Sequence, residues 1–472
     1  MSVQNTHYGA NKIKDMLADC KSIFFIGVGG INMSSLALIS KKLGYKVGGS
    51  DRTRTQLTEK LSDSGIEIFY SHSSDNVDNY DAVVYTVAIS EDNPEYNNAK
   101  GRNIPCISRA DFLGFLMTGY SRRIGISGMH GKSTCTSMCA SVFINAETDP
   151  TVLSGAVLKS MGGAYRIGDN SNFIFEACEY MDSFLDFYPT IAVILNVELD
   201  HVDYFESMEH IYSSFGKFAD IAFAENGCVV YNADDNNVIR AIEKSKGRKI
   251  GFSTLDKDAM FYADNICFNG GYPEFDVKLS GEDFCHIRLS VSGEHNVYNA
   301  LATCAVAYLC GIGGAKISEG LFEYTGADRR MEYKGKWCGA DVYDDYGHHP
   351  TEIKKTLEGA VKLGYNRVYC VFQPHTYSRT AGLFDELITS FDCVDKVIIA
   401  DIYAAREIDN GEVSAKKVAD HLKNGEYVGD MSHIAEYLTN ELRDGDLLVV
   451  MGAGDIYKLF DKMHFESKEE TK

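Results

Sequence analysis

The sequence predicts an α/β protein with three domains, each built on a sheet of mostly parallel strands. The chain has 472 residues, which is the length of about three ordinary domains. Short apolar segments alternate with stretches long enough for a helix, a rhythm typical of parallel sheets covered by helices. The apolar segments are continuous, as expected for strands that are buried on both faces.

The expected strands share this continuous apolar character: 23–26, 45–48, 82–85, 123–126, 173–175, 191–195, 228–231, 341–343, 367–372, 396–400 and 446–450. Between residues 253 and 292, short alternating runs with Gly and Pro predict an antiparallel edge. New strand-to-turn units begin near residues 123 and 326. We therefore expect domains over 1–118, 119–325 and 326–472, with a frayed tail after Phe465.

The composition excludes several classes of protein. The chain carries 46 basic and 67 acidic residues, a net charge of −21, which argues against a general nucleic-acid binder. Neither a signal peptide nor an apolar stretch of membrane-spanning length is visible. The 13 cysteines are scattered without a CxxC pair, which indicates small buried side chains in a reducing compartment rather than disulfides or a zinc site. We expect a soluble, cytoplasmic protein that binds no membrane.

A glycine-rich turn, GVGGIN, follows the first strand and opens a helix. Glycines such as Gly29 and Gly30 let the backbone approach a diphosphate, and the helix N-terminus offers free N–H groups to it. The next strand ends in Ser50 and Asp51, where an acid often contacts a ribose. Asn32 breaks the GxGxxG pattern, so a plain tight turn stays open beside a site for a dinucleotide or a nucleotide sugar.

A stronger motif, GISGMHGKST, spans residues 125–134 between a strand and a helix. Consecutive N–H groups there can cradle phosphate oxygens, Lys132 supplies a positive charge, and the hydroxyl of Ser133 can ligate Mg²⁺. Ile126 stands where the strict P-loop pattern has Gly, so this is a variant of that loop. The motif predicts ATP binding by Gly128, Met129, His130, Gly131, Lys132, Ser133 and Thr134.

Acidic residues follow two further strands. Glu176 ends the first, and the stretch from Asn196 to His201 follows the second. Open α/β sheets bind ligands at the carboxyl ends of strands, and Mg²⁺ takes carboxylates together with substrate phosphates. Glu176 and His201 are therefore candidate metal ligands beside Lys132, although each alone would more often be a solvated loop residue.

Weaker motifs fill the rest of the chain. Asn296 lies in GEHNVYNA, which alone would be a helix-capping region, and Arg330 in DRR, which is either an arginine finger or a solvated corner. The segment DDYGHHP after a strand is more often a loop than a zinc site. Arg379, in FQPHTYSRT, has the chemistry to hold a carboxylate, and MGAGDI forms another glycine turn.

Taken together and in this order, these motifs resemble those of the Mur ligases, over residues 22–456. The opening IGVGGINMSSLA, the segment AISEDNPE and the DDYGHHP and FQPH pair resemble the branch that joins L-alanine to UDP-N-acetylmuramate. The resemblance implies a Rossmann-like N-terminal domain, a central P-loop ATPase domain and a Rossmann-like C-terminal domain. It implies an ATP-dependent and Mg²⁺-dependent amide ligase that passes through an acyl phosphate in peptidoglycan precursor synthesis.

The resemblance also assigns roles to individual residues. Lys132, Glu176, His201 and Arg330 would be catalytic, and Ser133, Glu176 and His201 would hold metal. Asn296, Arg330 and Asp345 would contact ATP, while Tyr346, His348 and Arg379 would bind the alanine. The UDP-sugar would contact Gly29, Gly30, Ser50, Asp51, His72 and Thr86. The chain would be a monomer or a homodimer, and its general base is not evident beyond His201 as a candidate.

Two positions distinguish the branch. Other branches carry a carbamylated lysine where this chain has Phe215, with Lys217 two residues away. Thr376 stands where many relatives have Arg, which leaves the preference for L-alanine over glycine or L-serine open. The alternatives are a ligase of the same fold that joins a peptide to the muramate, an NAD-dependent oxidoreductase, and a non-catalytic nucleotide-sugar sensor.

Overall fold

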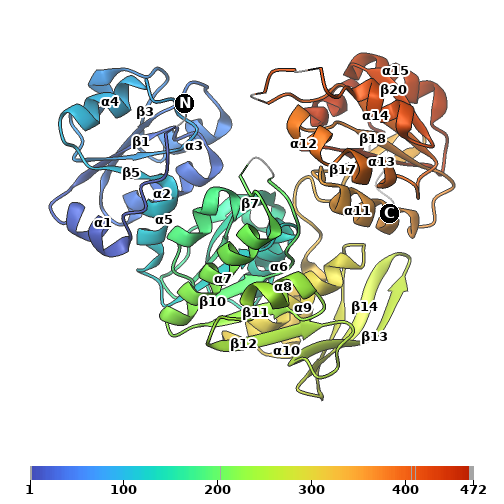
Figure 1. The fold of residues 1–472 in the computed structure, drawn as a ribbon, viewed down its shortest axis with the longest axis horizontal. Coiled ribbons are helices and arrows are strands. Elements are labelled where there is room, and N and C mark those ends of the chain that lie inside the picture. The colour runs from blue at the N-terminus through green and yellow to red at the C-terminus, as the bar shows by residue number, and fades with distance from the viewer. Residues whose placement is uncertain (1–2, 202–203, 406, 410, 467–472) are drawn as a thin grey trace. The chain divides into compact units, whose positions relative to one another are not determined.

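The structure, a computed structural model, describes residues 3–201, 204–405, 407–409 and 411–466. Three sheets follow one another along the chain, coloured from blue to red in Figure 1. By its internal contacts the chain divides into two compact units. One comprises Met1–Val197 and Glu209–Ile250, and the other comprises Glu198–Met208 and Gly251–Lys472.

The first sheet has five parallel strands in the order β3-β2-β1-β4-β5. The strands are β1 (Ser22–Ile26), β2 (Lys46–Ser50), β3 (Glu67–Phe69), β4 (Ala82–Tyr85) and β5 (Cys106–Ser108). The helices are α1 (Ala10–Met16), α2 (Ile31–Lys42), α3 (Gln56–Asp63), α4 (Pro94–Gly101) and α5 (Arg109–Met117), with the short η1 (Ser74–Val77). The strand order reverses between β1 and β4, the place where such sheets bind ligands.

The second sheet has ten strands in the order β15-β14-β13-β12-β11-β10-β6-β9-β7-β8. Its strands are β6 (Arg122–Ser127), β7 (Thr151–Leu158), β8 (Gly163–Arg166), β9 (Asn172–Glu176), β10 (Ile191–Ile194), β11 (Cys228–Asn232), β12 (Arg248–Ser253), β13 (Phe261–Asn269), β14 (Tyr272–Leu279) and β15 (Glu282–Arg288). Strand β6 lies between β10 and β9 and is parallel to both. Strands β13 to β15 are antiparallel, which confirms the edge predicted for residues 253–292, and β13 and β14 form a long hairpin in Figure 1.

The helices along this part of the chain begin with α6, which starts at the lysine of the P-loop motif. They are α6 (Lys132–Asn145), α7 (Met208–Ala224), α8 (Asn236–Ile242), α9 (His295–Leu309) and α10 (Gly314–Glu323), with the short η2 (Lys159–Met161) and η3 (Tyr180–Asp186). Phe215 of α7 packs its ring on Phe184, with centroids 5.2 Å apart, while Lys217 is exposed. Phe215, which stands where the resemblance puts the carbamylated lysine of other branches, is therefore a buried core residue.

The third sheet has six strands in the order β16-β17-β21-β18-β19-β20, and only β16 is antiparallel to its neighbour. The strands are β16 (Glu332–Trp337), β17 (Ala340–Asp345), β18 (Val368–Phe372), β19 (Lys396–Ala400), β20 (Gly425–Gly429) and β21 (Leu447–Met451). The helices are α11 (Pro350–Val361), α12 (Tyr377–Gly382), α13 (Phe384–Thr389), α14 (Ala415–His421) and α15 (Met431–Glu441), with η4 (Ile456–Lys462).

Strand β18 shows why the apolar segments are continuous. Val368, Cys370 and Phe372 belong to one hydrophobic cluster, and Tyr369 and Val371 belong to another. Successive side chains of a strand point to opposite faces, so a sheet with helices on both sides needs apolar residues at every position.

The predicted three-part α/β fold with mostly parallel sheets is confirmed. The boundaries at 118/119 and 325/326 remain predictions, although they fall in connections between sheets, after α5 and after α10. Among the described residues, no helix combines the length and the apolar character that crossing a bilayer requires. Most of the tail after Phe465 lies outside the described residues.

Candidate active site

The P-loop joins the end of β6 to the start of α6, as the motif predicts. Gly128 and Gly131 have φ values of +135° and +83°, a region that favours glycine. A Cβ at Gly128 would lie 3.1 Å from the backbone N of Asn196, so the loop also passes close to the chain after β10. The glycines therefore serve both the turn and a close backbone approach.

Lys132 is held inside this loop by four oxygens. Its Nζ donates to the carbonyls of Gly128 (2.5 Å) and Met129 (3.1 Å), and it lies 3.1 and 3.0 Å from the two carboxylate oxygens of the fully buried Glu179. Burial alone would lower the pKa of Lys132, but the carboxylates of Glu179 and Glu176 outweigh it and the pKa is raised. The loop thus keeps a charged ammonium group where a phosphate would be bound.

Asn196 fixes the P-loop backbone from the neighbouring strand. Its Oδ1 accepts the N–H of His130 at 2.8 Å, and its Nδ2 donates to the carbonyl of His130 at 2.9 Å. The N–H of Met129 donates to the backbone carbonyl of Asn196 at 3.3 Å. The sequence analysis noted Asn196 only as the start of an acidic stretch; its position directly after a continuous apolar run was the available signal.

Two of the predicted metal ligands lie in the first unit. Ser133 is the second residue of α6, and Glu176 ends β9, where it pairs in register with Ile126 of the P-loop strand. The Glu176 carboxylate accepts the N–H of Gly155 and the Ser154 hydroxyl. Hydroxyl and carboxylate oxygens are the ligands Mg²⁺ prefers, so both residues suit the predicted role.

The third predicted ligand, His201, belongs to the second unit. It adopts a φ of +50°, and its backbone N–H donates to Asp200 at 2.6 Å. Burial acts to raise the pKa of Asp200, but His201 and Arg379 overcome it and lower that pKa well below its usual range.

The glycine turn of the first sheet is built around Asp51. The N–H of Gly29 donates to the Asp51 carboxylate at 2.9 Å, and a Cβ at Gly29 would lie 2.7 Å from that oxygen. Gly30 is the N-cap of α2, and Thr86 follows β4 with its N–H donating to the Ile26 carbonyl at 3.3 Å. These predicted UDP-sugar residues gather at the carboxyl ends of β1, β2 and β4.

Ser50 and His72 meet at a residue that sequence reasoning did not select. Glu95 accepts from the Ser50 hydroxyl at 2.7 Å and lies 2.6 Å from Nδ1 of His72. Its side chain is fully buried. The only available signal was the NPE sequence at the start of α4.

The predicted nucleoside contacts lie in the second unit. Asn296 and Asn299 share one face of α9, where Asn299 donates to Oδ1 of Asn296 at 3.0 Å. Asp345 accepts the N–H groups of Met331 and Gly347, each at 2.8 Å. Burial raises the pKa of Asp345, with the charge of Arg330 opposing it.

Tyr346 stacks with both arginines of the DRR motif. The guanidinium carbons of Arg329 and Arg330 lie 4.9 and 5.2 Å from the centre of its ring. Arg329 also lies 3.3 Å from the Asp344 carboxylate and donates to the Gly452 carbonyl. Arg329 therefore anchors this segment to the third sheet, and Arg330 is the arginine placed beside the predicted ATP contact Asp345.

His348 and Arg379 line one pocket in the third sheet's loops. The pocket has about 220 Å³ of empty space, part of it open to solvent, and its other lining residues are Pro350, Phe372, Pro374, His375, Thr380, Leu383 and Leu387. Arg379 lies 3.3 Å from the Asp200 carboxylate. Burial lowers the pKa of His348 to about 4, despite the nearby Glu352.

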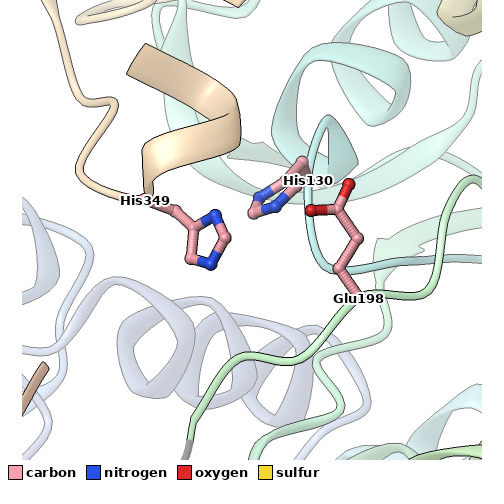
Figure 2. Close-up of side chains that lie close together, drawn as sticks. All are labelled: His130, Glu198 and His349. Carbon is pink, nitrogen blue, oxygen red and sulfur yellow. The ribbon is translucent and has the colours of Figure 1, made fainter. Parts of the chain in front are cut away.

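The second histidine of the HH pair, His349, has a structural role. His349 is the N-cap of α11, where its side chain accepts the N–H of Thr351 at 3.3 Å. The hydroxyl of Thr351 donates to Glu198 at 2.6 Å. Figure 2 shows His349 at the start of this helix and Glu198 on its own chain segment.

Three family models match the chain in succession. The Mur ligase family catalytic domain matches residues 22–121, the Mur ligase middle domain matches 126–307, and the Mur ligase glutamate ligase domain matches 329–454. The chain belongs to the Mur ligase family. The resemblance predicted from the motifs is thereby confirmed.

Among curated relatives, the UDP-N-acetylmuramate–L-alanine ligase of Acetivibrio thermocellus is 46% identical, over 93% of this chain and 94% of that protein. The enzyme of the same name from Clostridium acetobutylicum is 45% identical, over 93% and 96%. Among solved structures, the UDP-N-acetylmuramate–alanine ligase of Thermotoga maritima is 27% identical, with a TM-score of 0.77 over 93% of this chain and 97% of that one. A murein peptide ligase from Psychrobacter arcticus, 23% identical with a TM-score of 0.68, shares the fold.

Proposed function

We propose that this chain joins L-alanine to the lactyl carboxylate of UDP-N-acetylmuramate, with ATP converted to ADP and phosphate. The observation that carries the proposal is similarity along nearly the whole chain to relatives that bear this activity as their name. The geometry supports it, because a charged P-loop lysine, a glycine turn suited to a diphosphate and a small pocket with an arginine occur in one chain.

The chemistry requires an activated carboxylate. A carboxylate is a poor acceptor for an amine, so the γ-phosphoryl group of ATP first passes to it and forms an acyl phosphate. Lys132 neutralises charge on the transferring group, and the backbone N–H groups of the P-loop orient the phosphates. The amine of alanine then attacks the acyl carbon, the amide forms and phosphate leaves.

The residues also fit a divalent cation. Ser133, Glu176 and His201 offer a hydroxyl, a carboxylate and an imidazole, and Mg²⁺ bound with ATP supplies Lewis-acid stabilisation of charge on the phosphates. Glu176 already accepts hydrogen bonds through one carboxylate oxygen, from Ser154 and Gly155, which orients its group. Arg330 is the cation that would reach the γ-phosphate.

The amino-acid site is assigned to the pocket beside His348 and Arg379. Arg379 supplies a guanidinium for the alanine carboxylate, and the ring of Tyr346 lies 5.6 Å from the ring of His348, which lines the same pocket. The apolar side chains of Phe372, Leu383 and Leu387 are among the residues that line the pocket, and they suit a methyl group better than the hydroxyl of serine. Cytoplasmic location and a monomeric or dimeric state remain predictions.

A competition experiment tests the proposal. The protein is incubated with ATP, Mg²⁺ and UDP-N-acetylmuramate, together with equal concentrations of L-alanine, glycine, L-serine and a free tripeptide. The products are identified by mass. The expected main product is the L-alanyl adduct. A main product that carries the peptide would move the chain to the peptide-joining branch, and the absence of any adduct would contradict the ligase assignment.

A further inference from the structure

The carboxylate of Glu95 is fully buried near the start of α4. Glu95 is the second residue of α4, and the N-cap Asn93 fixes it by accepting the N–H groups of Glu95 and Tyr96, both at 3.0 Å. A fully buried carboxylate is costly unless donors surround it. Three donors do so here.

The three donors come from separate parts of the first sheet's loops. The Ser50 hydroxyl and Nδ1 of His72 approach Oε2 at 2.7 and 2.6 Å, and Nδ2 of Asn76 donates to Oε1 at 2.7 Å. A carboxylate accepts and does not donate, so Nδ1 of His72 carries the proton in this contact. Glu95 therefore selects one tautomer and one orientation of the His72 ring.

This orientation leaves the other ring nitrogen for a ligand. Both hydrogen bonds that described residues make with the ring, to Glu95 and to Ser50, involve Nδ1. The His72 side chain keeps 14% of its surface exposed while Glu95 keeps none. Nε2 is thus the polar atom that the ring presents outward.

The same cluster is joined to the glycine turn. The backbone carbonyl of Ser50 accepts the N–H groups of Gly27 at 2.8 Å and Val28 at 3.0 Å. Ser50 pairs in register with Ile26, the last residue of β1. Glu95 therefore connects the His72 ring to the turn that would bind the diphosphate.

We infer that Glu95 is a positioning residue for the nucleotide sugar: its buried carboxylate holds the His72 ring with Nδ1 protonated and inward, so that Nε2 binds a polar group of the substrate. The inference rests on the proposed function, because it takes UDP-N-acetylmuramate as the ligand. Glu95 itself acts only through His72 and Ser50.

A double-mutant cycle separates this role from a structural one. Binding of UDP-N-acetylmuramate to the full chain is measured by calorimetry for the wild type, Glu95→Gln, His72→Ala and the double variant. Because Gln offers one oxygen in place of two, we expect Glu95→Gln to raise the Kd by roughly 10-fold to 100-fold. In the His72→Ala background it should add little, because the residue that it positions is gone.

Asp81 supplies the matched control. Its carboxylate accepts from the N–H groups of Lys21 and Ser22, at 2.8 and 2.9 Å, and from the Ser22 hydroxyl, at the opposite end of the same sheet. Asp81→Asn should lower the thermal midpoint without changing the Kd. Effects of Glu95→Gln and His72→Ala that add fully would overturn the inference.

The tautomer of the ring provides a second readout, independent of the substrate. Nitrogen-15 NMR of the free wild-type chain should show His72 protonated at Nδ1, and Glu95→Gln should change that signal. A ring protonated only at Nε2 in the wild type would overturn the inference. Failure of the wild type to bind UDP-N-acetylmuramate would overturn the proposed function instead, and the NMR result would still decide the role of Glu95.

Discussion

The ammonium of Lys132 lies 3.0 Å from a carboxylate oxygen of Glu179, whose side chain is fully buried. The two residues are 47 positions apart in sequence and meet because the strands that precede them, β6 and β9, are neighbours. A buried carboxylate of this kind depends on its partner. The P-loop lysine therefore has two functions, one in phosphate binding and one in stability, and they can be separated.

Replacing Lys132 tests both functions. Lys132→Ala should abolish most ATP turnover and also destabilise the chain by about 3 to 5 kcal/mol, because the buried Glu179 carboxylate loses its ammonium partner. The double variant Lys132→Ala/Glu179→Gln should regain most of the stability without regaining turnover. Denaturant unfolding and phosphate release measure the two effects, and near-normal turnover in either folded variant would contradict the assignment of the P-loop.

Asn196 should affect ATP and leave the nucleotide sugar unaffected. Removal of its side chain in Asn196→Ala frees the backbone of His130, so the apparent KM for ATP should rise about 10-fold. Asn232→Ala is the control, because the side chain of Asn232 donates to the Leu195 carbonyl at 3.1 Å and accepts the N–H of Asp234, and its hydrogen bonds among the described residues do not include the P-loop. Equal rises in the two variants would indicate a general loosening of this region.

Arg379 should govern the amino acid. Arg379→Ala removes the guanidinium of the pocket, so the apparent KM for alanine should rise at least about 10-fold more than that for ATP. The matched control is Arg367→Ala, since Arg367 pairs with Asp446 at 2.6 Å before the start of β18. If the KM values for ATP and alanine rise together in Arg379→Ala, Arg379 is structural.

His348 should stay neutral under assay conditions. Burial lowers its pKa to about 4 from an ordinary value of 6.5, whereas hydrogen bonds to Asp276 and Glu274 raise the pKa of the exposed His286. The folded chain thus favours the neutral His348 ring. As the pH falls from 6.5 toward 4, the unfolded chain binds a proton at this ring and the folded chain does not, so the folded state loses stability. NMR titration compares the two rings; a His348 that titrates near 6.5 would show that it is not buried in solution.

The sequence predicted those features that depend on local pattern. Continuous apolar runs located the strands, and glycines with a following lysine located the P-loop, since both patterns lie within a few residues. The predicted end of β2 was two residues too early. Gly49 and Ser50 are buried because they pair with β1, and not because their side chains are hydrophobic. Strand order, which brings β9 beside β6, is a tertiary property.

The partners of buried charged groups could not be predicted from the sequence, because the tertiary structure brings them together. Glu176 and Glu179 lie in one acidic stretch, yet Glu179 pairs with Lys132 while Glu176 accepts from Gly155. Only the path of the chain after β9 decides which acid turns inward. The role of Glu95 likewise depends on its hydrogen bonds with Ser50 and His72, which come from other parts of the chain.

The most direct test of the whole account is phosphate release from ATP and Mg²⁺ in the presence of UDP-N-acetylmuramate, with and without L-alanine. Phosphate release should require both UDP-N-acetylmuramate and an amino acid, and it should be faster with L-alanine than with glycine or L-serine. Release that is indifferent to the amino acid, or that occurs without the UDP-sugar, would contradict an acyl-phosphate ligase specific for these substrates.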